Sequence, residues 1–244
     1  MQVIFERGTS ELQKWSASMY DSNARFVGDL AKAAVDLLNP QLGERILDIG
    51  CGDGYLMQKI ASQGAVVTGV DYSPELVAAA QARGLDVQHG NAEAIDFENV
   101  FDGAFSNAAL HWMRRADLVA QNVKRALKHG GRFVGEFAGA RNALLIRQAV
   151  HAALERRGMN PEEIDPWYLP TAEQYRAVLE GAGLRVTHIT LFDRPVVIDY
   201  PIAEWIRTFG SPYLTVLEDH ARAEFLEEVT RDLRACSKSI FETQ

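Results

Sequence analysis

The chain has 244 residues, of which 47% are hydrophobic and 24% are charged, a composition typical of a globular enzyme with a sizeable core. Its formal net charge of −8 argues against a nucleic-acid backbone or an anionic membrane as the main partner, because both repel an acidic surface. Two cysteines are too few for a disulfide framework, and no run of about 20 apolar residues is present. We therefore expect a cytoplasmic protein without a transmembrane segment.

The first part of the chain alternates helical and strand patterns. A helical pattern over residues 24–38 stops at Asn39 and Pro40. Predicted strands and helices then follow one another, the strands over residues 45–49, 65–70, 86–89, 101–106 and 131–137, and the helices over 56–62, 74–83 and 115–127. Right-handed crossovers between such units predict an α/β, doubly wound, mostly parallel sheet with helices on both faces.

This alternation stops near residue 137. Helical patterns cover residues 142–157, 171–182 and most of 203–240, with a proline-containing loop over 160–170. A β-rich segment over residues 184–191 is predicted to return to the sheet, and residues 196–198 are a further candidate strand. Ligands of open α/β sheets bind beyond the carboxyl ends of the strands, so we expect these helices to form a cap over the site.

A glycine-rich loop with Gly50, Gly52 and Gly54 follows the first predicted strand. Glycines allow a tight turn and a close approach to a ligand, and dinucleotide-binding folds use a similar loop. Here the bulky Tyr55 stands where that pattern needs a small residue. Asp48 and Asp53 would repel a pyrophosphate, whereas they would attract a ligand with a sulfonium and an ammonium group. The loop therefore favours the cationic ligand over NAD.

Asp71 ends the second predicted strand, about 20 residues beyond Gly50. A carboxylate at this position can accept hydrogen bonds from both hydroxyls of a ribose. The alternative is an acid that stabilises the start of the helix opened by Pro74, and we favour the ribose role.

Residues 46–54, with the sequence ILDIGCGDG, resemble the first motif of class I S-adenosylmethionine-dependent methyltransferases. Residues 69–73, 90–93, 101–107 and 127–133 resemble further motifs of that family in the same order. Residues 106–112 are similar to the trans-aconitate and malonyl-carrier-protein methyltransferase branches, which methylate carboxylates. Residues 15–20 and Phe26 resemble the opening helix of those branches.

The resemblance implies a role for individual residues. The loop around Gly50 would contact the methionine part of S-adenosylmethionine, Asp71 the ribose and Tyr72 the adenine. Asn91 stands where the family commonly has Asp, and its amide oxygen can still accept a hydrogen bond from the adenine amino group. Asn107 would border the reacting methyl group. The implied cofactor-binding set is Tyr20, Asp48, Gly50, Cys51, Gly52, Asp71, Tyr72, Asn91, Ala92, Glu93, Asn107 and Ala108.

The predicted function is methyl transfer from S-adenosylmethionine to a small molecule, most simply to a carboxylate oxygen, with S-adenosylhomocysteine as the product. The alternatives are a C- or N-methyltransferase, or a protein that binds the cofactor without transferring methyl. His111 is the candidate catalytic residue, as a base or a ligand of a substrate carboxylate, unless it only packs beside Trp112. Arg141 and Arg147 follow the fifth predicted strand and either reach an anionic substrate or pair at the surface. We predict no metal site and a monomer or homodimer.

The resemblance also suggests a division of the chain. Residues 1–38 would form N-terminal lid helices, 39–140 the S-adenosylmethionine-binding core, and 141–244 a helical cap with return strands in the same domain. Class I domains normally end with a seventh, antiparallel strand beside the fifth. Only four residues follow the last predicted helix, so we expect this strand to be missing, or replaced by residues 196–198.

Overall fold

The computed structural model describes residues 31–195 and 200–241. Contacts between Cα atoms group them into two compact units. The sheet unit contains residues 31–140 and 167–191, and the helical unit contains residues 141–166 and those from Phe192 onward. The predicted division into lid, core and cap stays a prediction.

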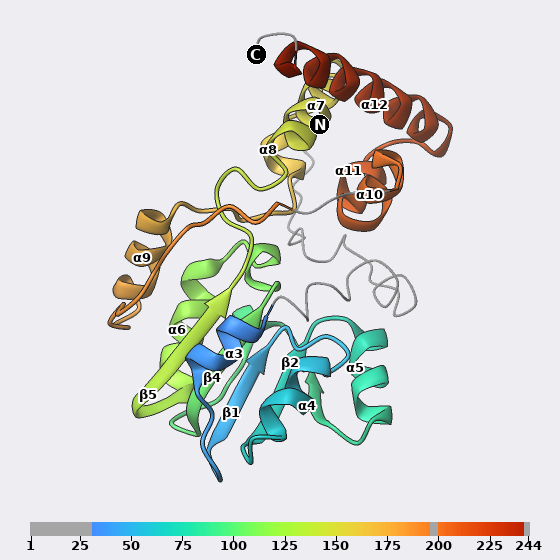
Figure 1. Ribbon diagram of the computed structural model, residues 1–244. Coiled ribbons are helices and arrows are strands. Elements are labelled where there is room, and N and C mark those ends of the chain that lie inside the picture. Colours follow the sequence, from blue (N-terminus) through green and yellow to red (C-terminus); the bar gives the residue numbers. More distant parts are fainter. Residues whose placement is uncertain (1–30, 196–199, 242–244) are drawn as a thin grey trace, which may run out of the picture. The chain divides into compact units, whose positions relative to one another are not determined.

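The sheet unit is built on five parallel strands in the order β3-β2-β1-β4-β5 (Figure 1). The strand order reverses between β1 and β4, and this switch point is where open α/β sheets bind their ligands. The predicted doubly wound α/β fold is confirmed. The strands are β1 (Arg45–Ile49), β2 (Val66–Asp71), β3 (Asp86–His89), β4 (Phe101–Asn107) and β5 (Leu127–Glu136).

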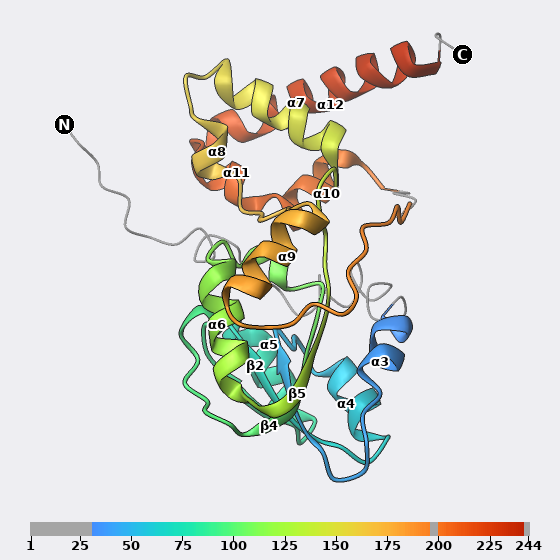
Figure 2. The ribbon, with the colours of Figure 1, turned by 90° about the vertical axis from the view of Figure 1, so that its left-hand side faces the viewer.

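Helices cover both faces of this sheet, and Figure 2 shows α6 and α4 on opposite sides of it. Successive residues of a strand point to opposite faces, so neighbours in β1 belong to different cores. Ile46 packs in a cluster with residues of α3, α4 and α5, whereas Leu47 packs in one with residues of α6 and α9. The helices are α3 (Lys32–Leu38), α4 (Tyr55–Ala61), α5 (Pro74–Ala82), α6 (Ala116–Ala126) and α9 (Ala172–Gly181), with single turns η2 (Ala92–Ala94) and η3 (Leu110–Trp112).

Local sequence explains where several of these helices begin and end. The Ser73 hydroxyl accepts a hydrogen bond from the N–H of Leu76, and Pro74 occupies the first turn of α5. Thr171 and Gln174 form a reciprocal capping box at the start of α9. Asn39, in the left-handed conformation, ends α3 directly before Pro40.

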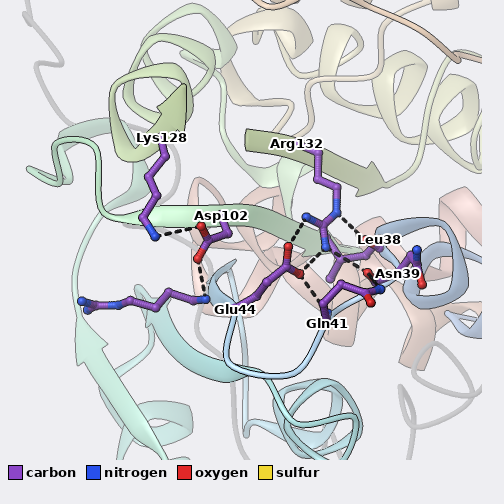
Figure 3. A network of polar contacts seen from close by, with 8 residues as sticks. Leu38, Asn39, Gln41, Glu44, Asp102, Lys128 and Arg132 are labelled. Carbon is purple, nitrogen blue, oxygen red and sulfur yellow. Dashed lines mark hydrogen bonds and ion pairs between the residues drawn. The ribbon is translucent and has the colours of Figure 1, made fainter. Parts of the chain in front are cut away.

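A polar network joins α3, β1, β4 and β5 at the end of the sheet opposite the glycine loop (Figure 3). The Arg132 guanidinium donates to both carboxylate oxygens of Glu44, at 2.8 and 2.6 Å, and to the backbone carbonyls of Leu38 and Asn39. Asp102 accepts hydrogen bonds from the N–H of Arg45 and from the ammonium group of Lys128. Arg132 thus satisfies carbonyl groups that the end of α3 leaves open, and these bonds hold α3 against β5.

The helical unit has its own core. Arg156, directly after α7, forms ion pairs with Glu228 and Asp232 of α12, and the Arg157 guanidinium lies 5.2 Å from the centroid of the Phe225 ring. Buried apolar residues of α7, α10 and α12 complete the packing. Its helices are α7 (Leu144–Glu155), α8 (Pro161–Ile164), α10 (Ile202–Phe209), α11 (Ser211–Thr215) and α12 (Asp219–Phe241).

The strand predicted over residues 184–191 is wrong, because this segment has no regular secondary structure. Leu184, Val186 and Ile189 pack against the core cluster on the α6 face, so their apolar side chains are covered without a strand partner. Beside β5, the described residues contain no seventh strand. The predicted strand over 196–198, the lid helices up to residue 30 and Tyr20 lie outside the described residues.

Candidate active site

The glycine loop connects β1 to α4 through three residues with positive φ. Gly50, Gly52 and Gly54 have φ angles of 71°, 57° and 82°, which residues with a side chain rarely adopt. The N–H groups of Gly50 and Cys51 both donate to the carbonyl of Val70 in β2. A Cβ atom at Gly50 would lie only 2.2 Å from the Cβ of Ala109. The absence of a side chain therefore lets the loop approach the end of β4.

Asp71 at the end of β2 is oriented by two backbone donors. One carboxylate oxygen accepts a 2.8 Å hydrogen bond from the N–H of Gly52, and the other accepts one of the same length from the N–H of Ser73. Burial raises the pKa of Asp71, while these hydrogen bonds act in the opposite direction because they favour the charged form. The carboxylate thereby ties the glycine loop to β2.

Asp48 lies in β1 just before the loop and is almost completely buried, with 2% of its surface exposed. Burial and the nearby charge of Asp71 raise the pKa of Asp48 to about 8. Cys51 is also buried and packs over Gly69, where a Cβ atom would meet its sulfur at 2.6 Å. Burial raises the pKa of the Cys51 thiol, so this cysteine is a packing residue rather than a nucleophile.

The segment after β3 forms the single turn η2. The side-chain oxygen of Asn91 accepts a hydrogen bond from the N–H of Glu93, and the Glu93 carboxylate accepts one from the N–H of Arg115. Ala92 is buried, and its carbonyl accepts a hydrogen bond from Asn122 of α6. Within the described part of the chain, Asn91 and Glu93 thus hold the turn in shape, and a contact of either with the cofactor stays a prediction.

Tyr72 directly follows β2 and is 41% exposed, with its ring centroid 6.1 Å from that of His89. The Nε2 atom of His89 lies 3.0 Å from the Tyr72 carbonyl oxygen. An exposed aromatic face beside Asp71 is suitable for a planar ring such as adenine.

The end of β4 carries a second unusual backbone position. Ala108 has a φ of 54°, and its N–H donates to the carbonyl of Glu136 in β5. Backbone strain of this kind persists where the surrounding structure enforces it and is common at functional sites. The Ser106 hydroxyl donates to the Ile49 carbonyl at 2.7 Å and holds β4 against the start of the glycine loop. Half-buried Asn107 lies between these two residues.

His111 lies in η3 and is held by a segment distant in sequence. Its backbone carbonyl accepts a 2.8 Å hydrogen bond from the N–H of Tyr168, and its ring lies 5.1 Å from that of Trp112. The Nδ1 atom is buried without a hydrogen-bond partner in the described part of the chain. Burial lowers the pKa of His111 to about 3, so the ring is neutral at pH 7.

Apart from Tyr20, which lies outside the described residues, the predicted cofactor-binding residues lie in the last positions of β1, β2 and β4 or directly after β1 to β4, at the carboxyl end of the parallel sheet. Three contacts were not expected: the Ser106 hydroxyl bond, the ion pair of Asp53 with Arg83 at 2.8 Å, and the docking of Tyr168 on His111. Only Asp53 gave a local signal, as an acid next to the start of a helix.

Arg147 does not pair at the surface. Its guanidinium donates to the buried carboxylate of Asp165, which also lies 3.0 Å from the Nε2 atom of His151. Residues 31–195 and 200–241 contain no cluster of histidine, cysteine or acidic residues that could hold a metal ion. None of the helices in these ranges combines the length and apolar character needed to cross a bilayer.

Comparison with known proteins gives consistent results. Residues 47–135 match a family described as a methyltransferase domain. The chain is 36% identical over 212 residues to an uncharacterised methyltransferase of Schizosaccharomyces pombe, covering 82% of this chain and 81% of the relative. It is 30% identical over 199 residues to a trans-aconitate 2-methyltransferase of Mycobacterium tuberculosis, covering 76% and 74%.

The YcgJ protein of Bacillus subtilis shares the fold, with a TM-score of 0.58 at 23% identity over 81% of this chain and 88% of that one. The structure agrees with these sequence similarities to methyltransferases, because it contains a parallel sheet, a glycine loop after β1 and an acid, Asp71, at the end of β2. The chain belongs to the class I S-adenosylmethionine-dependent methyltransferases.

Proposed function

We propose that this methyltransferase transfers the methyl group of S-adenosylmethionine to a carboxylate oxygen of a small organic acid. The donor supplies a methyl group activated by its sulfonium charge. Methyl transfer is an in-line displacement, in which the enzyme contributes mainly alignment and the exclusion of water. An acceptor that is already ionised at neutral pH needs no general base, whereas an alcohol or an acidic carbon does.

The environment of His111, whose Nδ1 atom is buried without a hydrogen-bond partner in the described part of the chain, is the observation that supports a carboxylate acceptor. With a pKa of about 3, the neutral ring is a weak base and is poorly suited to removing a proton from an alcohol or a phenol. It can still form a hydrogen bond to an acceptor oxygen. The M. tuberculosis relative is named for methylation of trans-aconitate, a carboxylate, and this agrees with the proposal.

The residues at the carboxyl ends of the strands have side chains and backbone groups that can bind S-adenosylmethionine. We propose that the backbone of Gly50, Cys51 and Gly52 contacts its methionine part, and that Asp71, already oriented by two N–H donors, receives the ribose hydroxyls. Tyr72 would lie against the adenine, and Asn91, Ala92 and Glu93 would border its edge. Asn107 and Ala108 would line the methyl-transfer position. These roles follow from residue chemistry at the carboxyl ends of β1 to β4.

We also propose that the acceptor is a small molecule rather than nucleic acid, in keeping with the net charge of −8.

The experiment that tests carboxylate methylation incubates the protein with methyl-labelled donor and pairs of acceptors, each pair a small di- or tricarboxylic acid and its amide. A carboxylate acceptor gives a methyl ester, which releases labelled methanol in alkali, whereas N- and C-methyl products do not. Label stable to alkali, or transfer to the amides alone, would contradict the proposal.

Donor binding is measured separately by calorimetry, with Asp71→Ala as the comparison. Loss of the ribose ligand should weaken donor binding by more than tenfold, since one charge-assisted hydrogen bond contributes about 1.5–3 kcal/mol. Equal binding by the parent and the variant would remove Asp71 from the donor site.

A further inference from the structure

Three carboxyl groups surround the glycine loop, and they differ in how their charges are balanced. Asp53 forms a 2.8 Å ion pair with Arg83. In residues 31–195 and 200–241, neither Asp48 nor Asp71 has an ion pair with a lysine or arginine. Two acids at one end of the sheet therefore lack a lysine or arginine partner in the described part of the chain.

Asp48 and Asp71 are held in different ways. Asp71 accepts hydrogen bonds from the N–H groups of Gly52 and Ser73, and such bonds stabilise a carboxylate. Asp48 is 2% exposed and lies near the negative charge of Asp71, and both conditions favour the neutral acid. Of the two groups, Asp71 is therefore the better stabilised as a carboxylate and Asp48 the better stabilised as a neutral acid.

The other titratable groups near this pair do not change that assignment. The buried Cys51 thiol stays neutral chiefly because burial raises its pKa, and the negative charges of Asp71 and Asp53 act in the same direction. His89 of β3 acts on Asp71 and lowers its pKa, which reinforces the charge on Asp71. On the β4 side, Asp48 is in register with Phe105, followed by Ser106, and neither residue titrates near pH 7.

We propose that the Asp48 carboxyl group releases a proton when the cationic methyl donor binds beside it, and recovers one when the donor has become the neutral thioether product. This inference rests on donor binding at the glycine loop. The proton goes to solvent on binding and returns from solvent after methyl transfer, so charge balances at each step. A carboxylate thus faces the sulfonium donor, and a neutral acid faces the product.

Asp48 then discriminates between donor and product. S-adenosylmethionine carries one more positive charge than S-adenosylhomocysteine, so only the donor strongly favours the ionised acid. As the pH increases towards 8, donor affinity should increase by up to about tenfold per pH unit, as expected when one proton is released on binding. The affinity for the product should change less, so the preference for donor over product should grow with pH.

The first experiment measures donor and product binding to the full chain by titration calorimetry at pH 6, 7 and 8, in two buffers with different ionisation enthalpies. The difference in heat between buffers gives the number of protons released. We expect close to one proton for the donor near pH 7, and fewer for the product. If the parent protein binds the donor without proton release, the inference is overturned; if it binds no donor at any pH, the proposed function fails as well.

The variant Asp48→Asn keeps the size of the side chain and fixes it in a neutral form. It should bind the donor as the parent does near pH 6, but roughly 100-fold more weakly near pH 8, because it cannot gain the carboxylate. The matched variant is Asp53→Asn, which removes the acid balanced by Arg83 and should retain proton release. Equal pH dependence in Asp48→Asn and the parent would overturn the assignment to Asp48.

A spectroscopic measurement on the parent protein covers the case in which Asp48→Asn does not fold. Infrared difference spectra of the protein with and without donor, near pH 7, should show the loss of one protonated carboxyl band on donor binding. The product should leave that band in place. An unchanged band with saturating donor would contradict the proposal.

Discussion

Position 50, at the start of the glycine loop, needs a glycine for two separate reasons. Its φ of 71° is one requirement for glycine, and the contact with Ala109 is a second. Gly84 meets only the first requirement, since its φ is 78° but no atom lies within 4 Å of the position that a Cβ would occupy. A comparison of alanine variants at the two positions therefore distinguishes the cost of a positive φ angle from the cost of a steric clash.

Gly50→Ala should destabilise the fold by about 2–4 kcal/mol, the sum of a left-handed alanine and an overpacked contact. It should also weaken donor binding, because relief of the clash moves the loop away from β4. Gly84→Ala should cost only about 1–2 kcal/mol and leave donor binding unchanged. Urea unfolding and calorimetry measure both effects, and equal losses in the two variants would show that the contact with Ala109 is unimportant.

His111 makes stability depend on pH in a defined direction. Its pKa is lowered by burial from an ordinary value near 6.5 to about 3. Between these values the unfolded chain binds a proton that the folded protein does not. The free energy of unfolding should therefore fall as the pH drops from about 6.5 towards 3.

His111→Gln should remove this contribution, so that urea unfolding from pH 7 to pH 4 shows a shallower loss of stability than in the parent. The control is His129→Gln, at an exposed histidine. If His111→Gln and the parent lose stability in parallel, His111 is not a neutral buried group in the folded protein.

At the scale of elements, the Arg132 network holds α3 against the sheet. One guanidinium joins the Glu44 carboxylate and the last carbonyls of α3, and both partners are at least half-buried in this arrangement. By contrast, Arg115 pairs with Asp117 in an exposed position, where ion pairs contribute little.

Arg132→Gln should lower the free energy of unfolding by about 1.5–3 kcal/mol, because it removes charge-assisted hydrogen bonds and takes away the donor to the Leu38 carbonyl at the end of α3. Arg115→Gln should change it by less than about 1 kcal/mol. Both values come from urea unfolding of the full chain. A loss in Arg132→Gln no larger than that in Arg115→Gln would mean that the network does not stabilise the fold.

Elements whose causes are local were predictable from the sequence. β1 is a continuous buried strand, Ser73 and Pro74 begin a helix, and the glycine loop follows β1 directly. Residues 184–191 alternate like a strand, but a strand also needs a partner, and the partner is not encoded in the segment itself. The same limit applies to His111, whose environment depends on Tyr168, and to Arg147, whose partner Asp165 is distant in sequence.

At the scale of the molecule, the two units have separate buried centres. The helical unit contains the ion pair of Arg147 with Asp165, in which Asp165 also lies near His151. Removing one partner of a buried pair leaves the other charge uncompensated, which costs about 3–5 kcal/mol. Units with their own cores can open independently.

Asp165→Asn should therefore increase hydrogen exchange in α7 and α8, while the amides of β1 and β4 keep their protection. Glu204→Gln, which removes an exposed pair with Arg207, should leave exchange in both units unchanged. Exchange measured by mass spectrometry distinguishes the units. A uniform increase across β1, β4 and α7 in Asp165→Asn would mean that the chain opens as one cooperative unit.

The chain leaves the sheet unit after Ala140 and returns to it at Trp167, and a 2.9 Å hydrogen bond from the Ala140 N–H to the Pro170 carbonyl joins the two segments near these points. The excursion between them is an insertion with clamped ends. Residues can be added or removed inside such an insertion without moving β5 or the segment that supports His111. The donor site can thus stay constant in evolution while the inserted stretch varies in length.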